Sequence, residues 1–68
     1  MQVVAKFNSR VRAVPQLTAP EVARTAPNVR YEVKQTRLLA GGFWVELEGL
    51  GWVPRSFRGV QVFRCSRL

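Results

Sequence analysis

The sequence predicts an all-β domain, a small closed or half-closed barrel of about five short strands. Prolines at positions 15, 20, 27 and 54, together with five glycines, interrupt any long helical period. The rest of the chain consists of short runs rich in Val, Phe, Trp, Tyr and Leu, separated by turn residues. A chain of 68 residues is too short for a two-sheet sandwich, so we expect one domain spanning residues 1–68.

Alternation and residue type define the individual strands. In the segment before the aromatic region, Val29, Tyr31 and Val33 lie on one face of a strand, and Asn28 before them suits a left-handed turn position. The only helical turn is expected at residues 19–24. The predicted strands are residues 2–7, 29–36, 43–48, 51–53 and 60–63.

Residues 43–53 read as a hairpin that contains both tryptophans. In its first strand, Phe43, Val45 and Leu47 share one face, whereas Trp44 and Glu46 share the other. The aliphatic face is expected to belong to the core.

The loop of this hairpin decides the face of the second tryptophan, because a slip of one residue exchanges the faces of a strand. A two-residue turn at residues 48–49 would place Trp52 on the Val45 face. A three-residue loop at residues 48–50, with a left-handed glycine or neighbour, would instead set Val45 opposite Val53 and Trp52 on the outer face. We prefer the three-residue loop because it groups the aliphatic side chains and keeps the glutamates away from the core.

The composition argues against an enzyme and against a metal protein. The chain has no histidine and no aspartate, and Cys65 is its only cysteine, so neither a disulfide within the chain nor a Cys-His pair can form. No phosphate-binding or Gly-rich cofactor motif is present. Glu46 and Glu48 share a strand face, but two glutamates on an exposed hairpin usually serve solubility. We therefore expect no catalytic residue, metal or cofactor.

The N-terminal residues lack the apolar run of about 7–15 residues that an export signal needs. No apolar stretch approaches the roughly 20 residues of a membrane-spanning helix. We expect a cytoplasmic protein, and the sequence leaves open whether it is trimmed from a longer precursor.

The net charge of +7 arises from nine arginines, two lysines and four glutamates. Such a charge on a small domain favours a polyanion or an acidic protein face as the partner. The arginines are scattered along the chain and form no block. A GC-rich coding sequence would produce the same excess of arginine without any function.

The order of several motifs resembles the bacterial SH3 (SH3b) family over about residues 9–57. That family typically reads V-R-x-x-P, a variable loop, a strand that follows a glycine, G-W-x-x-V and a closing G-W-V. The matching segments are residues 11–15 (Val-Arg-Ala-Val-Pro), 19–22 (Ala-Pro-Glu-Val), 31–33 (Tyr-Glu-Val), 42–45 (Gly-Phe-Trp-Val) and 51–53 (Gly-Trp-Val). Asn28 replaces the usual glycine, and the first tryptophan is displaced by a residue or two. The resemblance implies an SH3-like barrel that works as a targeting or binding module.

The segment 51–57, Gly-Trp-Val-Pro-Arg-Ser-Phe, also resembles the end of a eukaryotic-type SH3 domain. By that resemblance Trp52, Pro54 and Phe57 line a peptide groove, with Trp44 as a wall. Phe57 stands where that family has tyrosine, and it lacks the hydroxyl that binds a ligand carbonyl. Residues 54–57 could instead form a 3₁₀ turn between the last two strands.

Two functions of different classes remain. The first is a protein-interaction module, which would be an adaptor, an inhibitor or a subunit of a larger assembly such as a phage particle, binding a protein or copies of itself. The second is a nucleic-acid binder with aromatic stacking and arginine–phosphate contacts. Only Arg55 and Arg58 lie near the aromatics in the sequence, which favours protein binding. The candidate binding residues are Trp44, Trp52, Pro54, Arg55, Phe57 and Arg58.

The decisive question for the first function is whether the tryptophans are core or surface. Tryptophan is seldom fully buried and is enriched at binding hot spots. Our main hypothesis is that Trp52, with Trp44, Pro54 and Phe57, forms an exposed apolar patch. We expect Phe43, Tyr31 and Val53 to be core.

Overall fold

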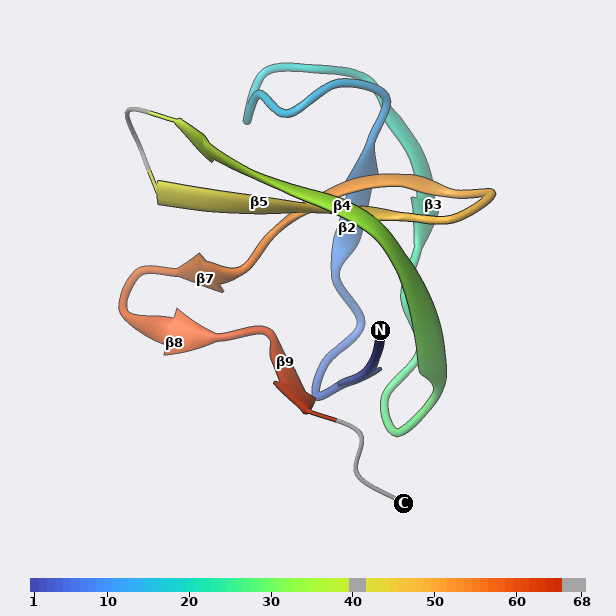
Figure 1. The fold of residues 1–68 in the computed structure, drawn as a ribbon. Helices are drawn as coiled ribbons and strands as arrows, with labels where there is room; N and C mark the ends of the chain where they lie inside the picture. Colours follow the sequence, from blue (N-terminus) through green and yellow to red (C-terminus); the bar gives the residue numbers. More distant parts are fainter. Residues whose placement is uncertain (40–41, 66–68) are drawn as a thin grey trace.

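Nine β-strands and their turns make up the part of the chain that the computed structural model describes, residues 1–39 and 42–65 (Figure 1). These residues contain no helix, so the all-β prediction is confirmed. The strands are β1 (Gln2–Ala5), β2 (Arg10–Arg12), β3 (Glu21–Arg24), β4 (Arg30–Leu39), β5 (Gly42–Leu47), β6 (Gly51–Pro54), β7 (Ser56–Phe57), β8 (Val60–Gln61) and β9 (Phe63–Cys65).

The long strand β4 joins the two halves of the sheet. Its residues 30–32 pair with β1, and its residues 33–39 pair with β5. The register shifts between Val33 and Gln35, and such an extra residue bends a strand. The curve of β4 brings both halves around one interior, which gives a small barrel-like fold (Figure 1). Seven strands lie in the order β3-β2-β6-β5-β4-β1-β9, and β7 and β8 form a separate hairpin.

The interior is filled by aliphatic side chains and one phenylalanine. Val11, Leu47 and Val53 are at most 1% exposed, as expected for the inward face of β2, β5 and β6. Tyr31 and Val33 of β4 are partly buried against this cluster. Since a domain this small has little interior, each of these side chains is a large share of its apolar burial. The whole cluster comprises Ala5, Val11, Val45, Leu47, Val53, Val62 and Phe63.

The β5–β6 hairpin has the predicted three-residue loop. Val45 lies opposite Val53, and Glu46 lies opposite Trp52. Gly49 has a φ of 77°, the left-handed conformation that the loop requires. Asn28 likewise has a φ of 66°, as its place before β4 predicted. Both turn assignments are therefore confirmed.

Two predicted turns are strands instead. The expected helical turn at residues 19–24 is wrong, because residues 21–24 form β3 and pair with β2. Residues 54–57 do not form a 3₁₀ turn, since Ser56 and Phe57 make up β7 and pair with Gln61 and Val60 of β8. The predicted strand at residues 60–63 is accordingly divided between β8 and β9.

Candidate functional site

The two tryptophans lie on the predicted face but are not exposed. Trp44 is 6% exposed and Trp52 is 7% exposed, so the hypothesis that they form a surface patch is wrong. They share the face of the β5–β6 hairpin that is turned away from Val45 and Val53. Alternation predicted this face correctly, but it could not show that a second layer of side chains covers it.

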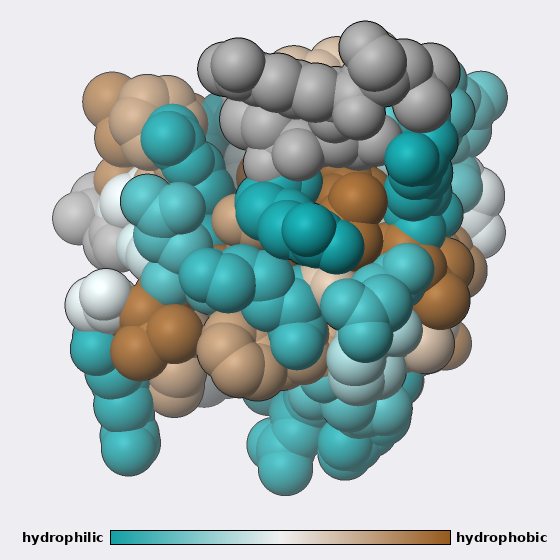
Figure 2. Space-filling model, turned by 90° about the horizontal axis from the view of Figure 1, so that it is seen from below, coloured by the Kyte–Doolittle hydropathy of each residue, from teal (hydrophilic) through white to brown (hydrophobic). Residues whose placement is uncertain are grey.

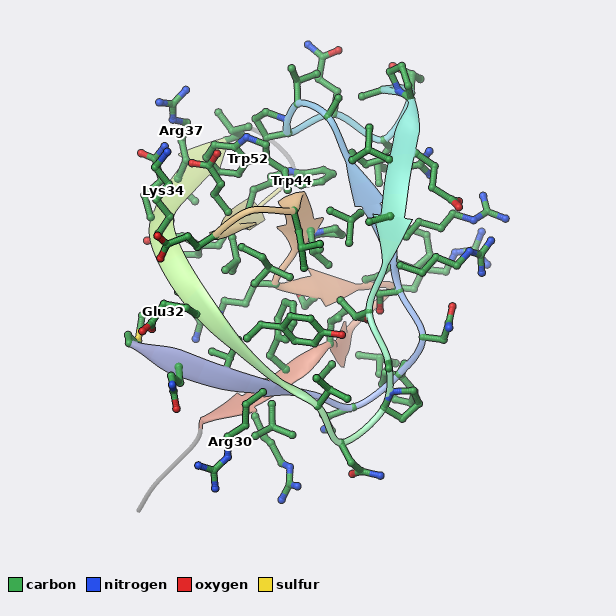
Figure 3. The ribbon with its side chains drawn as sticks, turned by 90° about the vertical axis from the view of Figure 1, so that its right-hand side faces the viewer. Arg30, Glu32, Lys34, Arg37, Trp44 and Trp52 are labelled. Atoms are coloured by element: carbon green, nitrogen blue, oxygen red, sulfur yellow. The ribbon has the colours of Figure 1, made fainter. Side chains whose placement is uncertain are left out.

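Strand neighbours and an arginine cover this face. Arg37 of β4 lies opposite Trp44, and its guanidinium carbon lies 5.6 Å from the centroid of the Trp52 ring. Arg12 of β2 lies opposite Trp52 on its other side and donates a 3.0 Å hydrogen bond to the carbonyl oxygen of Ala19. Figure 3 shows Arg37 at the edge of the tryptophan pair. The tryptophans therefore support the fold.

Phe43 differs from its expected environment in the opposite direction, because it is exposed. It was expected in the core with Val45 and Leu47, yet it is 43% exposed. It lies beyond the last β5 position that pairs with β6, which is Trp44 opposite Pro54. The interior does not extend that far, so alternation alone gave the wrong environment.

The apolar surface of the protein is divided, and four of the eleven exposed large hydrophobic residues in the described part of the chain line one hollow. On the visible part of the face in Figure 2, hydrophobic side chains emerge in separate patches between hydrophilic ones. Four exposed large hydrophobic residues nevertheless line the same hollow, with a volume of about 520 Å³: Phe7, Leu17, Phe57 and Val60. They are 45% to 56% exposed. We call this hollow the groove.

Three segments that are far apart in the sequence build the groove. Residues 7–10 lead into β2, Leu17 belongs to the loop between β2 and β3, and residues 57–60 belong to the β7–β8 hairpin. Pro54 and Val53 of β6 also line it. The structure thus brings together Pro54, Phe57 and Arg58 of the predicted site.

Thr25 holds the first of these segments in place. Its side chain is 1% exposed and is the only buried polar residue in the described part of the chain. The Thr25 hydroxyl donates a 2.8 Å hydrogen bond to the carbonyl oxygen of Phe7 and accepts a 2.9 Å hydrogen bond from the backbone N–H of Ser9. Both bonds are partly buried and join residues far apart in the sequence, so they fix the path of residues 7–9.

The β7–β8 hairpin presents Phe57 and Arg58. Its two turn residues, Arg58 and Gly59, have φ values of 52° and 79°, the pattern of a type I′ turn. The guanidinium carbon of Arg58 lies 5.3 Å from the centroid of the Phe57 ring. Arg58 thus reaches the groove from a backbone conformation that suits glycine or asparagine better.

A second hollow adjoins the groove. Leu17, Pro54, Phe57 and Arg58 line both, so they form a wall between them. Trp44 reaches the second hollow and Trp52 lines neither.

Arg55 lies just outside both hollows. Its guanidinium carbon is 5.4 Å from the ring centroid of Phe43, which does line the second hollow.

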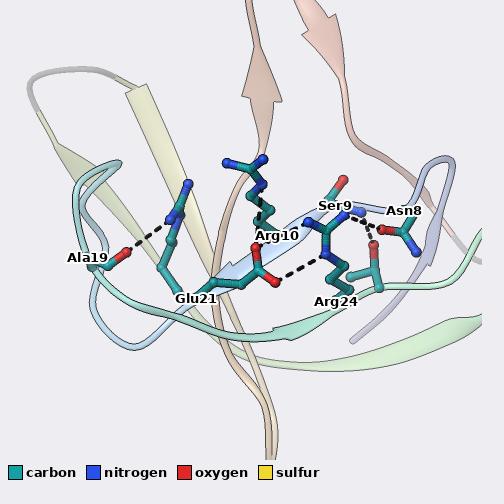
Figure 4. Close-up of polar contacts among 8 residues, drawn as sticks. Asn8, Ser9, Arg10, Ala19, Glu21 and Arg24 are labelled. Atoms are coloured by element: carbon teal, nitrogen blue, oxygen red, sulfur yellow. Dashed lines mark hydrogen bonds and ion pairs between the residues drawn. The ribbon is translucent and has the colours of Figure 1, made fainter.

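The groove is cationic at its rim. Arg10, Arg12 and Arg58 line it, whereas none of the glutamates does. The nearest carboxylate network is that of Glu21, which pairs with Arg10 at 3.4 Å and with Arg24 at 3.1 Å (Figure 4). An apolar hollow with guanidinium groups at its rim can hold an apolar side chain beside a carboxylate or phosphate.

The described residues contain no cluster of three or more side chains suited to hold a metal ion. Glu46 accepts a 2.7 Å hydrogen bond from the side-chain amide of Gln35.

Within residues 1–39 and 42–65, no helix has the length and apolar character of a membrane span.

The sequence analysis missed three of the four exposed hydrophobic residues that define the groove. Phe7, Leu17 and Val60 carried no motif, and each lies in or beside a turn where an apolar residue has no local partner. An isolated exposed hydrophobic residue is common on protein surfaces, so only their convergence in space is informative. Arg37 was missed because its aromatic neighbours lie on other strands.

No protein-family model, curated protein or solved structure matches the chain. The resemblance to the bacterial SH3 family is therefore supported by the order and spacing of the sequence motifs alone.

Proposed function

We propose that the protein is a small, non-enzymatic protein-interaction module that binds a segment of a partner protein in the groove. The observation that supports this most directly is the convergence of Phe7, Leu17, Phe57 and Val60, each about half exposed, at one hollow. A domain of this size would gain stability by burying such side chains, so their common exposure favours a surface that a partner covers.

This role agrees with the rest of the chain. The net charge of +7 favours partners with an acidic face. A domain of 68 residues that presents an apolar groove would serve as an adaptor, as an inhibitor or as a subunit of a larger assembly.

The test compares two leucines of similar exposure. Leu17 lines the groove and is 56% exposed, whereas Leu38 of β4 is 65% exposed and lines neither hollow. Tagged wild-type, Leu17→Ser, Phe57→Ser and Leu38→Ser proteins are used to capture partners from a lysate of the native host, with and without nuclease. Circular dichroism checks that each variant is folded.

We expect wild-type and Leu38→Ser proteins to retain the same partner in both lysates, and Leu17→Ser and Phe57→Ser to lose it. Retention of the partner by folded Leu17→Ser and Phe57→Ser would exclude the groove as the interface. Sedimentation velocity shows whether the partner is a second copy of the chain, because the two groove variants would then remain monomeric where wild type does not.

Nucleic acid is the second candidate, and the net charge of +7 favours it. Arg37, Arg55 and Arg58 each lie over an aromatic ring. From the sequence, only Arg55 and Arg58 were expected near the aromatic residues. Proteins that bind single strands combine positive charge along the strand with aromatic rings on which bases stack.

A gel-shift titration with random single- and double-stranded DNA and RNA tests this candidate. Affinity should fall steeply with salt, because each neutralised phosphate releases counterions. The absence of any shift at low salt would exclude it.

A further inference from the structure

The geometry points to an acidic protein segment with one large apolar side chain as the occupant of the groove. The apolar side chain would lie between Leu17, Phe57 and Val60, and flanking Asp or Glu side chains would contact Arg58 and Arg10. This inference rests on the proposed function and specifies its partner.

The charges around the groove have one sign. Arginines contribute all of its charged lining residues, and no carboxylate of the described chain lines it. A neutral segment would gain only the apolar contacts, whereas a basic segment would be repelled. An arginine fork binds a carboxylate through two parallel hydrogen bonds, which adds both strength and orientation.

The three arginines are not equally available. Arg12 already donates to the carbonyl oxygen of Ala19 at 3.0 Å, and Nε of Arg10 lies 3.4 Å from a carboxylate oxygen of Glu21. Arg58 makes no ion pair or side-chain hydrogen bond within the described residues, and its contact there is with the Phe57 ring. Arg58 is therefore the main candidate to bind a carboxylate.

The backbone of Arg58 supports this assignment. A left-handed φ of 52° at the first position of a two-residue turn favours asparagine or glycine over arginine. Such a conformation costs free energy and, in proteins, is often found where a side chain has a binding role. Here it directs a guanidinium to the wall shared by both hollows.

The same arginines favour a peptide over a nucleic acid. Base stacking needs an open ring face, but a guanidinium already lies over one face of Phe57, of Phe43 and of Trp52. Trp52 is also buried. An apolar side chain needs no open ring face, since it can enter the hollow between Leu17 and Val60.

Nuclear magnetic resonance titrations of the ¹⁵N-labelled full chain test the inference. The probe is the peptide acetyl-Ser-Glu-Asp-Phe-Glu-Glu-Ser-amide. Its controls are an analogue with Gln and Asn in place of the acids, an analogue with Ser in place of Phe, and decathymidylate. We expect the acidic peptide to shift the amides of residues 7–9, 17 and 57–60, and to bind at least about tenfold more tightly than either analogue.

Two arginine variants test whether Arg58 binds the carboxylates of the peptide. Asparagine suits the turn at position 58, and Arg58→Asn should weaken binding of the acidic peptide about tenfold. Arg30→Gln is the control, because Arg30 is the first residue of β4 and lines neither hollow, so this variant should bind the peptide as wild type does. Arg30 is labelled in Figure 3, away from the tryptophans. The peptide analogues test the charge independently if Arg58→Asn gives the spectrum of an unfolded chain.

The outcomes separate the two proposals. Equal binding of the acidic and neutral peptides in the groove would overturn the acidic preference and leave the proposed function standing. If decathymidylate shifts the groove amides at lower concentration than the peptide, nucleic acid replaces the peptide as the occupant. If neither these probes nor any peptide selected from a random library shifts the groove amides, both proposals fail.

Discussion

The guanidinium of Arg37 lies over the ring of Trp52, with its central carbon 5.6 Å from the ring centroid. Trp44 lies directly opposite Arg37 across β4 and β5. Arg37 therefore covers Trp52 and is the cross-strand partner of Trp44, and strand alternation places both tryptophans outside the aliphatic core. The barrel thus buries large side chains on both faces of its central hairpin.

Replacing either tryptophan should destabilise the fold. Trp44→Ala and Trp52→Ala each remove a side chain that is at most 7% exposed, and such truncations typically cost about 3–5 kcal/mol. That loss is comparable to the whole stability of a small domain. Urea unfolding measures the change, with Phe43→Ala as the control because Phe43 is 43% exposed. Tryptophan variants as stable as the Phe43 variant would show that the rings are not part of the core.

The sequence predicted those features that depend on neighbours along the chain. Alternation and turn residues identified β1, β4, β5 and β6, and the grouping of Val45 with Val53 selected the correct hairpin loop. β3 was missed because Glu, Ala and Arg are good helix formers. Pairing with β2 outweighs that preference in the structure.

The features that the sequence did not predict depend on contacts between distant segments. Trp52 was assigned to the correct face, but the residues around it, Arg37 among them, lie on other strands. The groove was predicted only in part, because most of its lining residues come from distant segments. Pro54, Phe57 and Arg58 are close in sequence, whereas Phe7 and Leu17 reach the groove only through the fold.

Gly51 should not tolerate a side chain. A Cβ at this position would lie 2.6 Å from the carbonyl oxygen of Arg12 and 3.0 Å from a methyl group of Val11, and Gly51 has a φ of 148°. Overpacking and backbone strain each cost about 1–3 kcal/mol, so Gly51→Ala should be strongly destabilising.

Gly49→Ala is the matched control for this substitution. Gly49 has a φ of 77° but no atom within 4 Å of an added Cβ, so only the backbone term remains. Thermal unfolding of the two variants should therefore give a clearly lower midpoint for Gly51→Ala. Equal midpoints would mean that β2 does not pack closely against Gly51.

Thr25→Val should weaken both the fold and the groove. Valine has nearly the shape of threonine but leaves the carbonyl of Phe7 and the N–H of Ser9 without their partner. Both groups are only partly buried, so the loss should lie near the lower end of the about 1–3 kcal/mol that an unpaired buried group costs. Amide hydrogen exchange should show faster exchange at Ser9, whereas Thr36→Val, on an exposed part of β4, should leave it unchanged. Unchanged exchange at Ser9 in Thr25→Val would contradict this role of the hydroxyl.

Arg58→Asn should keep or raise the stability of the protein although it removes a contact. A non-glycine residue in the left-handed conformation costs roughly 1–2 kcal/mol, and asparagine reduces this cost. The lost contact with the Phe57 ring is worth about 0.5–1 kcal/mol at an exposed site. The relief of strain is therefore expected to be at least as large as the loss.

Arg55→Asn separates these two effects. Arg55 makes a similar contact with Phe43, 5.4 Å from the ring centroid, but is not among the residues with positive φ. Its replacement loses the contact and relieves no strain, so urea unfolding should show a small loss of stability for Arg55→Asn and none for Arg58→Asn. If Arg58→Asn is the less stable of the two, the turn does not strain Arg58, and its conformation gives no reason to assign a binding role to its side chain.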